Sequence, residues 1–96
     1  MYNRLETWGF HWPILVGIKL QELRLGILEL EDMYSDPPTI RTPGLAGTID
    51  VIGMTRSVRF VWFVVEPRMI DRMLCVRDVL ELSRQEFDDA LRSAGR

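Results

Sequence analysis

The sequence is poor in cysteine, histidine and lysine, and each shortage excludes a class of site. Cys75 is the only cysteine, so these 96 residues can form neither an internal disulfide nor a cysteine-based zinc site. It stands between two aliphatic residues and far along the chain from His11, the only histidine. We expect Cys75 to be a small buried residue and not a nucleophile, and His11 to be partly buried and hydrogen-bonded.

Long hydrophobic runs and a large net charge are also missing. No apolar segment approaches the roughly 18 to 20 residues that span a bilayer, and the first residues lack a signal-peptide pattern. The formal net charge of −2 argues against general binding to nucleic acids. These observations predict one cytoplasmic domain without membrane contact.

Arginine supplies almost all of the positive charge, since Lys19 is the only lysine among twelve basic residues. Residues 1–40 hold three basic and six acidic residues, whereas residues 41–96 hold nine arginines and eight acidic residues. A biased base composition of the coding DNA explains the arginine content. The alternative is that planar guanidinium groups bind carboxylates or phosphates at an interface.

The segment Phe60–Val65 has six consecutive β-branched or aromatic residues, which are typical of a strand. Because both alternating faces are apolar, we expect a central strand over about residues 58–65, covered on two sides. Residues 48–55 and 70–76 are predicted to pair with it, the second after a turn at Pro67–Arg68. The fold class is therefore α+β, with a small antiparallel sheet packed with a helix from the N-terminal half and a C-terminal helix.

Residues 68–94 have an alternative interpretation as one long helix, because their apolar residues keep a roughly heptad spacing. A break near Ser83 is better supported, because Ser83 and Glu86 form a capping box. We expect the last helix to run from there to about Ala94 and to end at Gly95. Its buried residues are predicted to be Phe87, Ala90 and Leu91.

The first twelve residues contain an aromatic cluster, which consists of Tyr2, Trp8, Phe10 and Trp12. Trp8, Phe10 and Trp12 fall on one side of an extended chain. An edge strand or a lid over the core fits this pattern. The alternative is that Trp8 and Trp12 are interface anchors, since tryptophan is enriched at binding hot spots.

Residues 13–34 fit one helix or a pair of strands, and we predict one helix. Pro13 suits a first helical turn, and one apolar stripe follows helical spacing: Leu20, Leu23, Ile27, Leu30 and Tyr34. Period-two alternation over residues 23–31 favours strands instead. A second apolar stripe lies nearly opposite the first: Ile14, Ile18, Leu25 and Leu28. A helix that is apolar on two sides must be covered by the sheet and the N-terminal aromatic residues, or by a second copy of the protein.

Residues 35–47 are predicted to form a loop, because three prolines and two glycines occur among thirteen residues. The loop is a semi-rigid connector, or else a partner-binding arm with Ile40 and Leu45 as anchors.

No catalytic spacing, metal-binding motif or cofactor motif is present, so we expect no metal and no cofactor. Arg56 and Arg59 flank the start of the central strand, and Arg68 and Arg72 follow it. Gathered at one end of the sheet, they would form a basic patch that grips phosphate or an acidic protein surface. The alternative is that they form ion pairs within the chain, with Asp50, Asp71 or Asp78.

Three stretches of residues 41–96 carry a family resemblance: TPGLAG before the sheet, RSVRFVWFVVEP as an arginine-bearing central strand, and RQEFDDALRSA as a closing helix. They resemble the RelE/HigB-like toxins of toxin–antitoxin systems. That family carries a lysine-rich segment before its last helix, where this chain has Glu81 and Leu82. The resemblance implies a ribonuclease that acts on mRNA, alone or at the ribosome, with Arg56 and Arg59 facing the RNA.

The leading prediction is a non-enzymatic module for protein–protein binding or assembly, and the ribonuclease toxin is its alternative. We expect a protein partner or a second copy of the chain, and nucleic acid only under the alternative. The candidate binding residues are Arg56, Arg59, Arg68, Arg72, Trp8, Trp12, Ile40 and Leu45.

Overall fold

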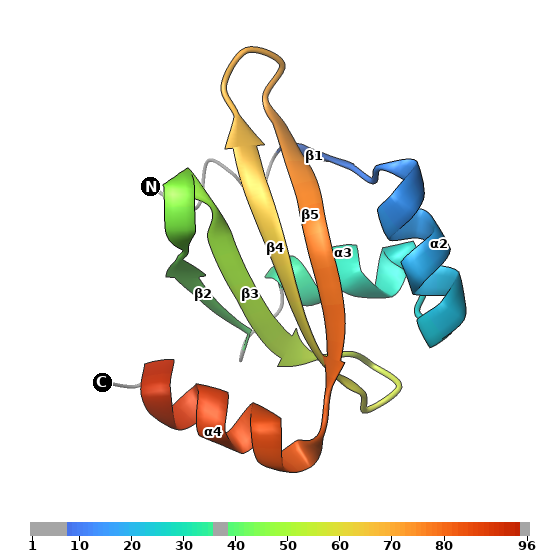
Figure 1. Cartoon of the computed structure of the whole chain (residues 1–96), viewed down its shortest axis with the longest axis vertical. Helices are drawn as coiled ribbons and strands as arrows, with labels where there is room; N and C mark the ends of the chain where they lie inside the picture. The colour runs from blue at the N-terminus through green and yellow to red at the C-terminus, as the bar shows by residue number, and fades with distance from the viewer. Residues whose placement is uncertain (1–7, 36–38, 95–96) are drawn as a thin grey trace.

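A five-stranded mixed sheet forms the centre of the fold, with its strands in the order β1-β5-β4-β3-β2 (Figure 1). The computed structural model describes residues 8–35 and 39–94. The strands are β1 (Gly9–His11), β2 (Ile40–Pro43), β3 (Ile49–Met54), β4 (Phe60–Arg68) and β5 (Met73–Leu82). The helices are α2 (Ile14–Leu23), α3 (Ile27–Ser35), α4 (Arg84–Ala94) and the 3₁₀ turn η1 (Leu45–Gly47). The α+β class is thereby confirmed.

Strand β4 is the middle strand of the sheet and is covered on both faces, as predicted. Val61, Phe63 and Val65 are buried on the face that carries α2 and α3. On the other face Phe60 stacks on Phe87 of α4, with ring centroids 4.6 Å apart. The strand begins at Phe60 and not near residue 58, where Val58 has a positive φ of 63°, and it ends later than predicted, because Pro67 continues it to Arg68.

The prediction of a purely antiparallel sheet is wrong at one edge. Strand β1 pairs in parallel with Met73–Cys75 of β5, while the other three pairings are antiparallel. Beyond Cys75, no strand of the described residues pairs with β5 on this side. Helix α2 instead lies beside β5 (Figure 1), and Lys19 forms an ion pair of 2.8 Å with Asp78.

The aromatic residues near β1 belong to the core, as the edge-strand interpretation predicted. Phe10 meets Tyr34 edge to face at 5.3 Å, and Trp12 lies 6.2 Å from Phe63, both between ring centroids. Trp8 is half-buried against the same core. His11 is exposed, so its expected burial is wrong. Tyr2 lies outside the described residues.

The prediction of one helix over residues 13–34 is wrong, although its helical character is confirmed. Helix α2 ends at Leu23, because Arg24 takes the left-handed conformation (φ 57°) and turns the chain. The backbone amide of Leu25 then donates to the carbonyl of Leu20 at 2.9 Å. Helix α3 begins after Gly26, whose amide donates to Glu29 Oε1 at 3.4 Å.

Two further boundaries differ from the prediction. The segment expected to be a loop contains β2, which pairs with β3 and carries Pro43 at the edge of the sheet, where a missing amide is tolerated. Strand β5 begins at Met73, so the turn occupies residues 69–72 and not Pro67–Arg68. The buried position of Cys75 is confirmed.

The capping box of α4 is confirmed in both directions. The amide of Glu86 donates to Ser83 Oγ at 3.1 Å, and the amide of Ser83 donates to Glu86 Oε1 at 2.8 Å. Phe87 is buried, as predicted, while Ala90 and Leu91 are half-buried. The predicted end at Gly95 lies outside the described residues.

Two glycines provide a matched test of this packing. A Cβ on Gly53 would lie 2.7 Å from Thr39 Oγ1 and 2.9 Å from Met33 Cγ, whereas a Cβ on Gly17 would meet nothing within 4 Å. We expect Gly53→Ala to lower the free energy of unfolding by about 1–3 kcal/mol through overpacking. Gly17→Ala should raise it by up to ~1 kcal/mol, because alanine favours the helix. Urea unfolding measures both, and equal effects would contradict the packing described.

Candidate functional site

The four candidate arginines lie at opposite ends of β4 and do not form one basic patch. Arg56 and Arg59 precede the strand, and Arg68 and Arg72 lie at its far end. The nine-residue strand β4, which ends at Arg68, puts the two pairs roughly 30 Å apart. The expectation that they share one end of the sheet is therefore wrong.

Arg59 is engaged in contacts within the chain. Its Nε donates to Glu81 Oε2 at 2.8 Å, and Nη2 pairs with Glu81 Oε1 at 2.6 Å. Nη1 donates to the carbonyl oxygen of Arg24 at 2.6 Å, and Nη2 also donates to the carbonyl of Leu23. The guanidinium group thus joins β4 and β5 to the end of α2, where unsatisfied carbonyls favour a cation.

The remaining arginines show a mixture of pairing and exposure. Arg68 forms an ion pair of 2.8 Å with Asp71, one of the predicted internal partners. Arg56 and Arg72 are exposed. Arg59 pairs with Glu81 instead of Asp50, Asp71 or Asp78, a partner that the sequence argument had not considered.

The candidate aromatic and aliphatic anchors divide into buried and exposed residues. Trp8 and Trp12 pack against the core, and Trp12 Nε1 donates to Glu31 Oε2 of α3 at 2.8 Å. Ile40 is half-buried on β2 opposite Ile52. Leu45 is exposed in η1, so it alone of these four presents its whole side chain to solvent.

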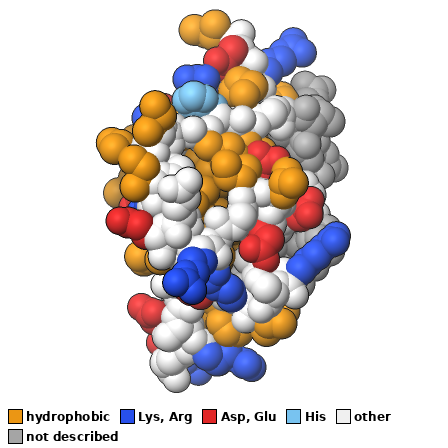
Figure 2. Space-filling view, turned by 90° about the vertical axis from the view of Figure 1, so that its right-hand side faces the viewer, with side chains coloured by type: hydrophobic (Ala, Val, Ile, Leu, Met, Phe, Trp, Pro, Cys, Tyr) orange, Lys and Arg blue, Asp and Glu red, His pale blue; other side chains and the backbone are white. Residues whose placement is uncertain are grey.

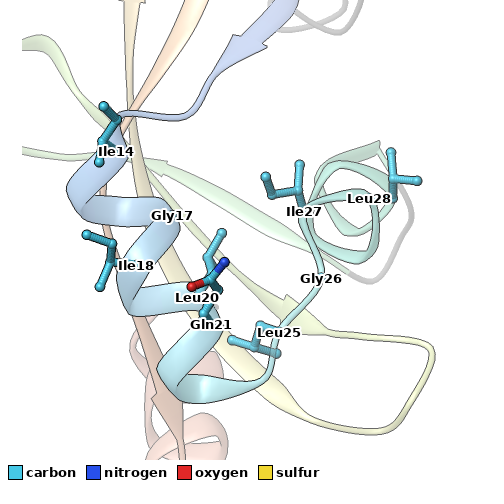
Figure 3. A pocket seen from close by; sticks show the side chains of 9 residues that line it. All are labelled: Ile14, Gly17, Ile18, Leu20, Gln21, Leu25, Gly26, Ile27 and Leu28. Atoms are coloured by element: carbon cyan, nitrogen blue, oxygen red, sulfur yellow. The ribbon is translucent and has the colours of Figure 1, made fainter.

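An apolar groove with a volume of about 620 Å³ lies between α2 and α3. Ile27 projects from α3 toward α2, and Leu25 lies between the two helices (Figure 3). Of the described residues that line the groove, Gln21 alone has a polar side chain. The lining residues are Ile14, Gly17, Ile18, Leu20, Gln21, Leu25, Gly26, Ile27 and Leu28.

The groove is apolar because each helix carries apolar side chains beyond the face that packs against the sheet. Val16 and Leu20 of α2 and Leu30, Met33 and Tyr34 of α3 are buried. The predicted second stripe, Ile14, Ile18, Leu25 and Leu28, lines the groove in full. Gly17, Gly26 and Ile27 also line the groove and were not predicted to do so. The two glycines could have indicated a groove, because a residue without a side chain leaves open space beside a helix.

Large apolar side chains around the groove are exposed to an unusual degree. Ile14 is 82% exposed, Leu15 80% and Leu28 74%, while Ile18 and Ile27 are about half as exposed. Figure 2 shows hydrophobic side chains gathered on this side of the molecule around a hollow, with acidic side chains beside it. Contiguous exposed apolar surface of this kind marks an interaction site.

Acidic residues follow the apolar wall on α3. Glu31 lies one helical turn beyond Ile27, and Asp32 lies one turn beyond Leu28, so each shares the side of the apolar residue before it. Ile27 points toward α2, whereas Leu28 points away from it (Figure 3). The hydroxyl of Ser57 donates to Glu29 Oε2 at 2.7 Å, and this hydrogen bond lowers the pKa of the Glu29 carboxyl. Residues Ile27–Ser35 contain no basic side chain.

The described part of the chain has little that favours catalysis. Among residues 8–35 and 39–94, no three His, Cys, Asp or Glu side chains gather as a metal-binding group. None of the helices in these ranges is long and apolar enough to cross a membrane.

Comparison with known proteins adds no relative. No protein-family model matches the chain, and neither the curated proteins nor the solved structures contain a match. Arguments about function therefore rest on the geometry of the groove.

The contacts of Arg59 predict a stability that depends on pH. The hydrogen bond from Arg59 lowers the pKa of Glu81. The ion pair therefore stabilises the fold at pH values above the ordinary carboxyl pKa, and this stabilisation is lost as the pH falls through the lowered pKa. We expect Arg59→Ala to lower the free energy of unfolding by about 2 kcal/mol at pH 7. Glu81→Gln should cost less than Arg59→Ala at pH 7, and its cost should shrink as the pH falls toward 3.

Urea unfolding at both pH values measures these differences, with the exposed Arg56→Ala as the control. An unchanged midpoint for Arg59→Ala would mean that its contacts do not hold the helix end. A Glu81→Gln cost that was the same at pH 3 as at pH 7 would contradict the role of the ionised carboxylate.

Proposed function

We propose that the protein is a non-enzymatic binding module that takes the apolar face of a partner helix into the groove between α2 and α3. The observation that carries this proposal is the exposure of Ile14, Ile18, Ile27 and Leu28 around one concave surface. Natural helix-in-groove complexes use the same combination of a hydrophobic channel and spaced apolar anchors.

The energetics favour an occupant for this surface. Burial of an Ile or Leu side chain contributes about 1.5–3 kcal/mol. Allowing for the part of each side chain that is already buried, covering four of them contributes on the order of 5 kcal/mol before the cost of association. Additional contacts outside the groove would supply the rest of a micromolar affinity.

The composition of the groove favours a polypeptide over a small polar substrate. Sites for small molecules usually enclose the ligand and direct several polar groups at it. Here Gln21 is the one polar side chain of the lining, and the flanking residues Ile14 and Leu28 are largely open to solvent. An extended apolar ridge, such as one face of a helix, matches such a channel.

The resemblance to RelE/HigB-like toxins stays a prediction. That function needs Arg56 and Arg59 to reach RNA, and Arg59 is engaged with Glu81 and two backbone carbonyls. The carboxylate of Glu81 beside it would repel a phosphate. Growth arrest on expression, relieved by Arg59→Ala in a variant that still folds, would favour the toxin over the binding module.

A display selection tests the binding module. A library of helical peptides with random surface residues should yield amphipathic binders of the wild-type protein. Ile18→Glu places a charge in the groove and should weaken these binders at least tenfold, about 1.4 kcal/mol or more. The matched control is Leu45→Glu, because Leu45 is exposed in η1, which lies on the far side of the sheet from α2 (Figure 1).

Titration calorimetry or fluorescence anisotropy measures the affinities, and circular dichroism verifies that both variants fold. Binders that respond to Leu45→Glu and not to Ile18→Glu would move the docking site to the η1 segment. A selection without enrichment of amphipathic sequences would refute the groove as a helix-binding surface.

A further inference from the structure

The charges beside the groove differ between its two walls. The α3 wall continues from Ile27 and Leu28 into Glu31 and Asp32, and no base follows on this helix. Glu31 accepts from the neutral Nε1–H of Trp12, a donor that brings no positive charge. Asp32 is exposed.

The positive charges near the groove are fewer and partly used. Lys19 of α2 is held in an ion pair with Asp78 of β5. Arg24 lies in the connector at one end of the groove, away from the part of α3 that carries the acidic residues. Two further arginines lie against α3, because the charge of Arg59 acts on Glu29 and Arg41 lies 5.1 Å from the ring centroid of Tyr34. Glu31 and Asp32 are therefore the acidic residues of α3 that remain to attract a partner.

We propose that the partner is a basic amphipathic helix, with apolar residues at i, i+3, i+4 and i+7 and with lysine or arginine flanking them on the side that meets α3. This inference rests on the function proposed above and adds the chemistry of the partner. Carboxylates at Glu31 and Asp32 would attract such a helix during approach and fix the side on which its basic residues lie.

The same charges disfavour a second copy of the chain as the occupant. A two-fold contact places the same surface on both sides of the interface. A two-fold contact that placed α3 against α3 would bring together Glu29, Glu31 and Asp32 of both copies, and neither helix carries a base. Like charges brought together in this way cost free energy unless a cation intervenes.

A pair of designed peptides tests the inference. Both carry the same leucine face over roughly 18 residues, enough for appreciable helix content. One is flanked by lysine and the other by glutamate. We expect the lysine peptide to bind at least tenfold more tightly at low salt, with a ratio that falls as salt is added. Asp32→Lys should weaken the lysine peptide and strengthen the glutamate peptide.

The control for charge is Asp89→Lys, the same change on α4, which packs on the opposite face of the sheet. It should leave both affinities unchanged. The control for the groove is Gly17→Phe, which fills open space beside α2 and should abolish binding of both peptides. Gly17→Ala serves as its small counterpart and should keep binding.

The outcomes separate the two proposals. Equal affinities for both peptides, lost together in Gly17→Phe, would overturn the basic partner and leave the helix-binding groove standing. A failure of both peptides to bind would overturn both proposals. A dimer detected by light scattering and dissociated by Ile18→Glu would assign the groove to a second copy and overturn the basic partner.

Discussion

The guanidinium group of Arg59 ties the connector between α2 and α3 to the sheet, and the angle between these helices depends on that tie. Its hydrogen bonds reach Glu81 on β5 and the carbonyl oxygens of Leu23 and Arg24. The carbonyls at a helix end lack partners within the helix. At the left-handed turn of Arg24, the carbonyls of Leu23 and Arg24 both accept from the same guanidinium group. One residue at the start of the central strand therefore helps to hold the groove open as a fixed shape.

Local sequence patterns were sufficient for the elements that depend on nearby residues. The central strand followed from its β-branched and aromatic residues, and the last helix followed from the capping box of Ser83 and Glu86. The break between α2 and α3 was not predictable in the same way. The carbonyl of Arg24 at this break accepts a hydrogen bond from Arg59, which is 35 residues away in the sequence. The parallel pairing of β1 with β5 joins segments that are still further apart.

Part of the candidate site could be predicted from the sequence. The stripe of Ile14, Ile18, Leu25 and Leu28 was recognised as apolar surface in excess of one core face, and its members line the groove. On one straight helix they would have formed a flat strip. The turn at Arg24 folds this strip so that the two halves face a common hollow. By contrast, Trp8 and Trp12 pack against the core. The sequence could not distinguish this role from binding, because an aromatic residue uses the same chemistry in a core and at an interface.

Helix α2 forms a wall of the groove and also lies along β5 on the side away from β4, where no strand of the described residues pairs with β5 beyond Cys75. A bare strand edge invites addition of further strands and, at high concentration, polymerisation. A ligand that displaced α2 from the sheet would expose that edge of β5 to solvent. A ligand seated between α2 and α3 would instead press α2 against β5, so that occupancy and colloidal solubility would increase together.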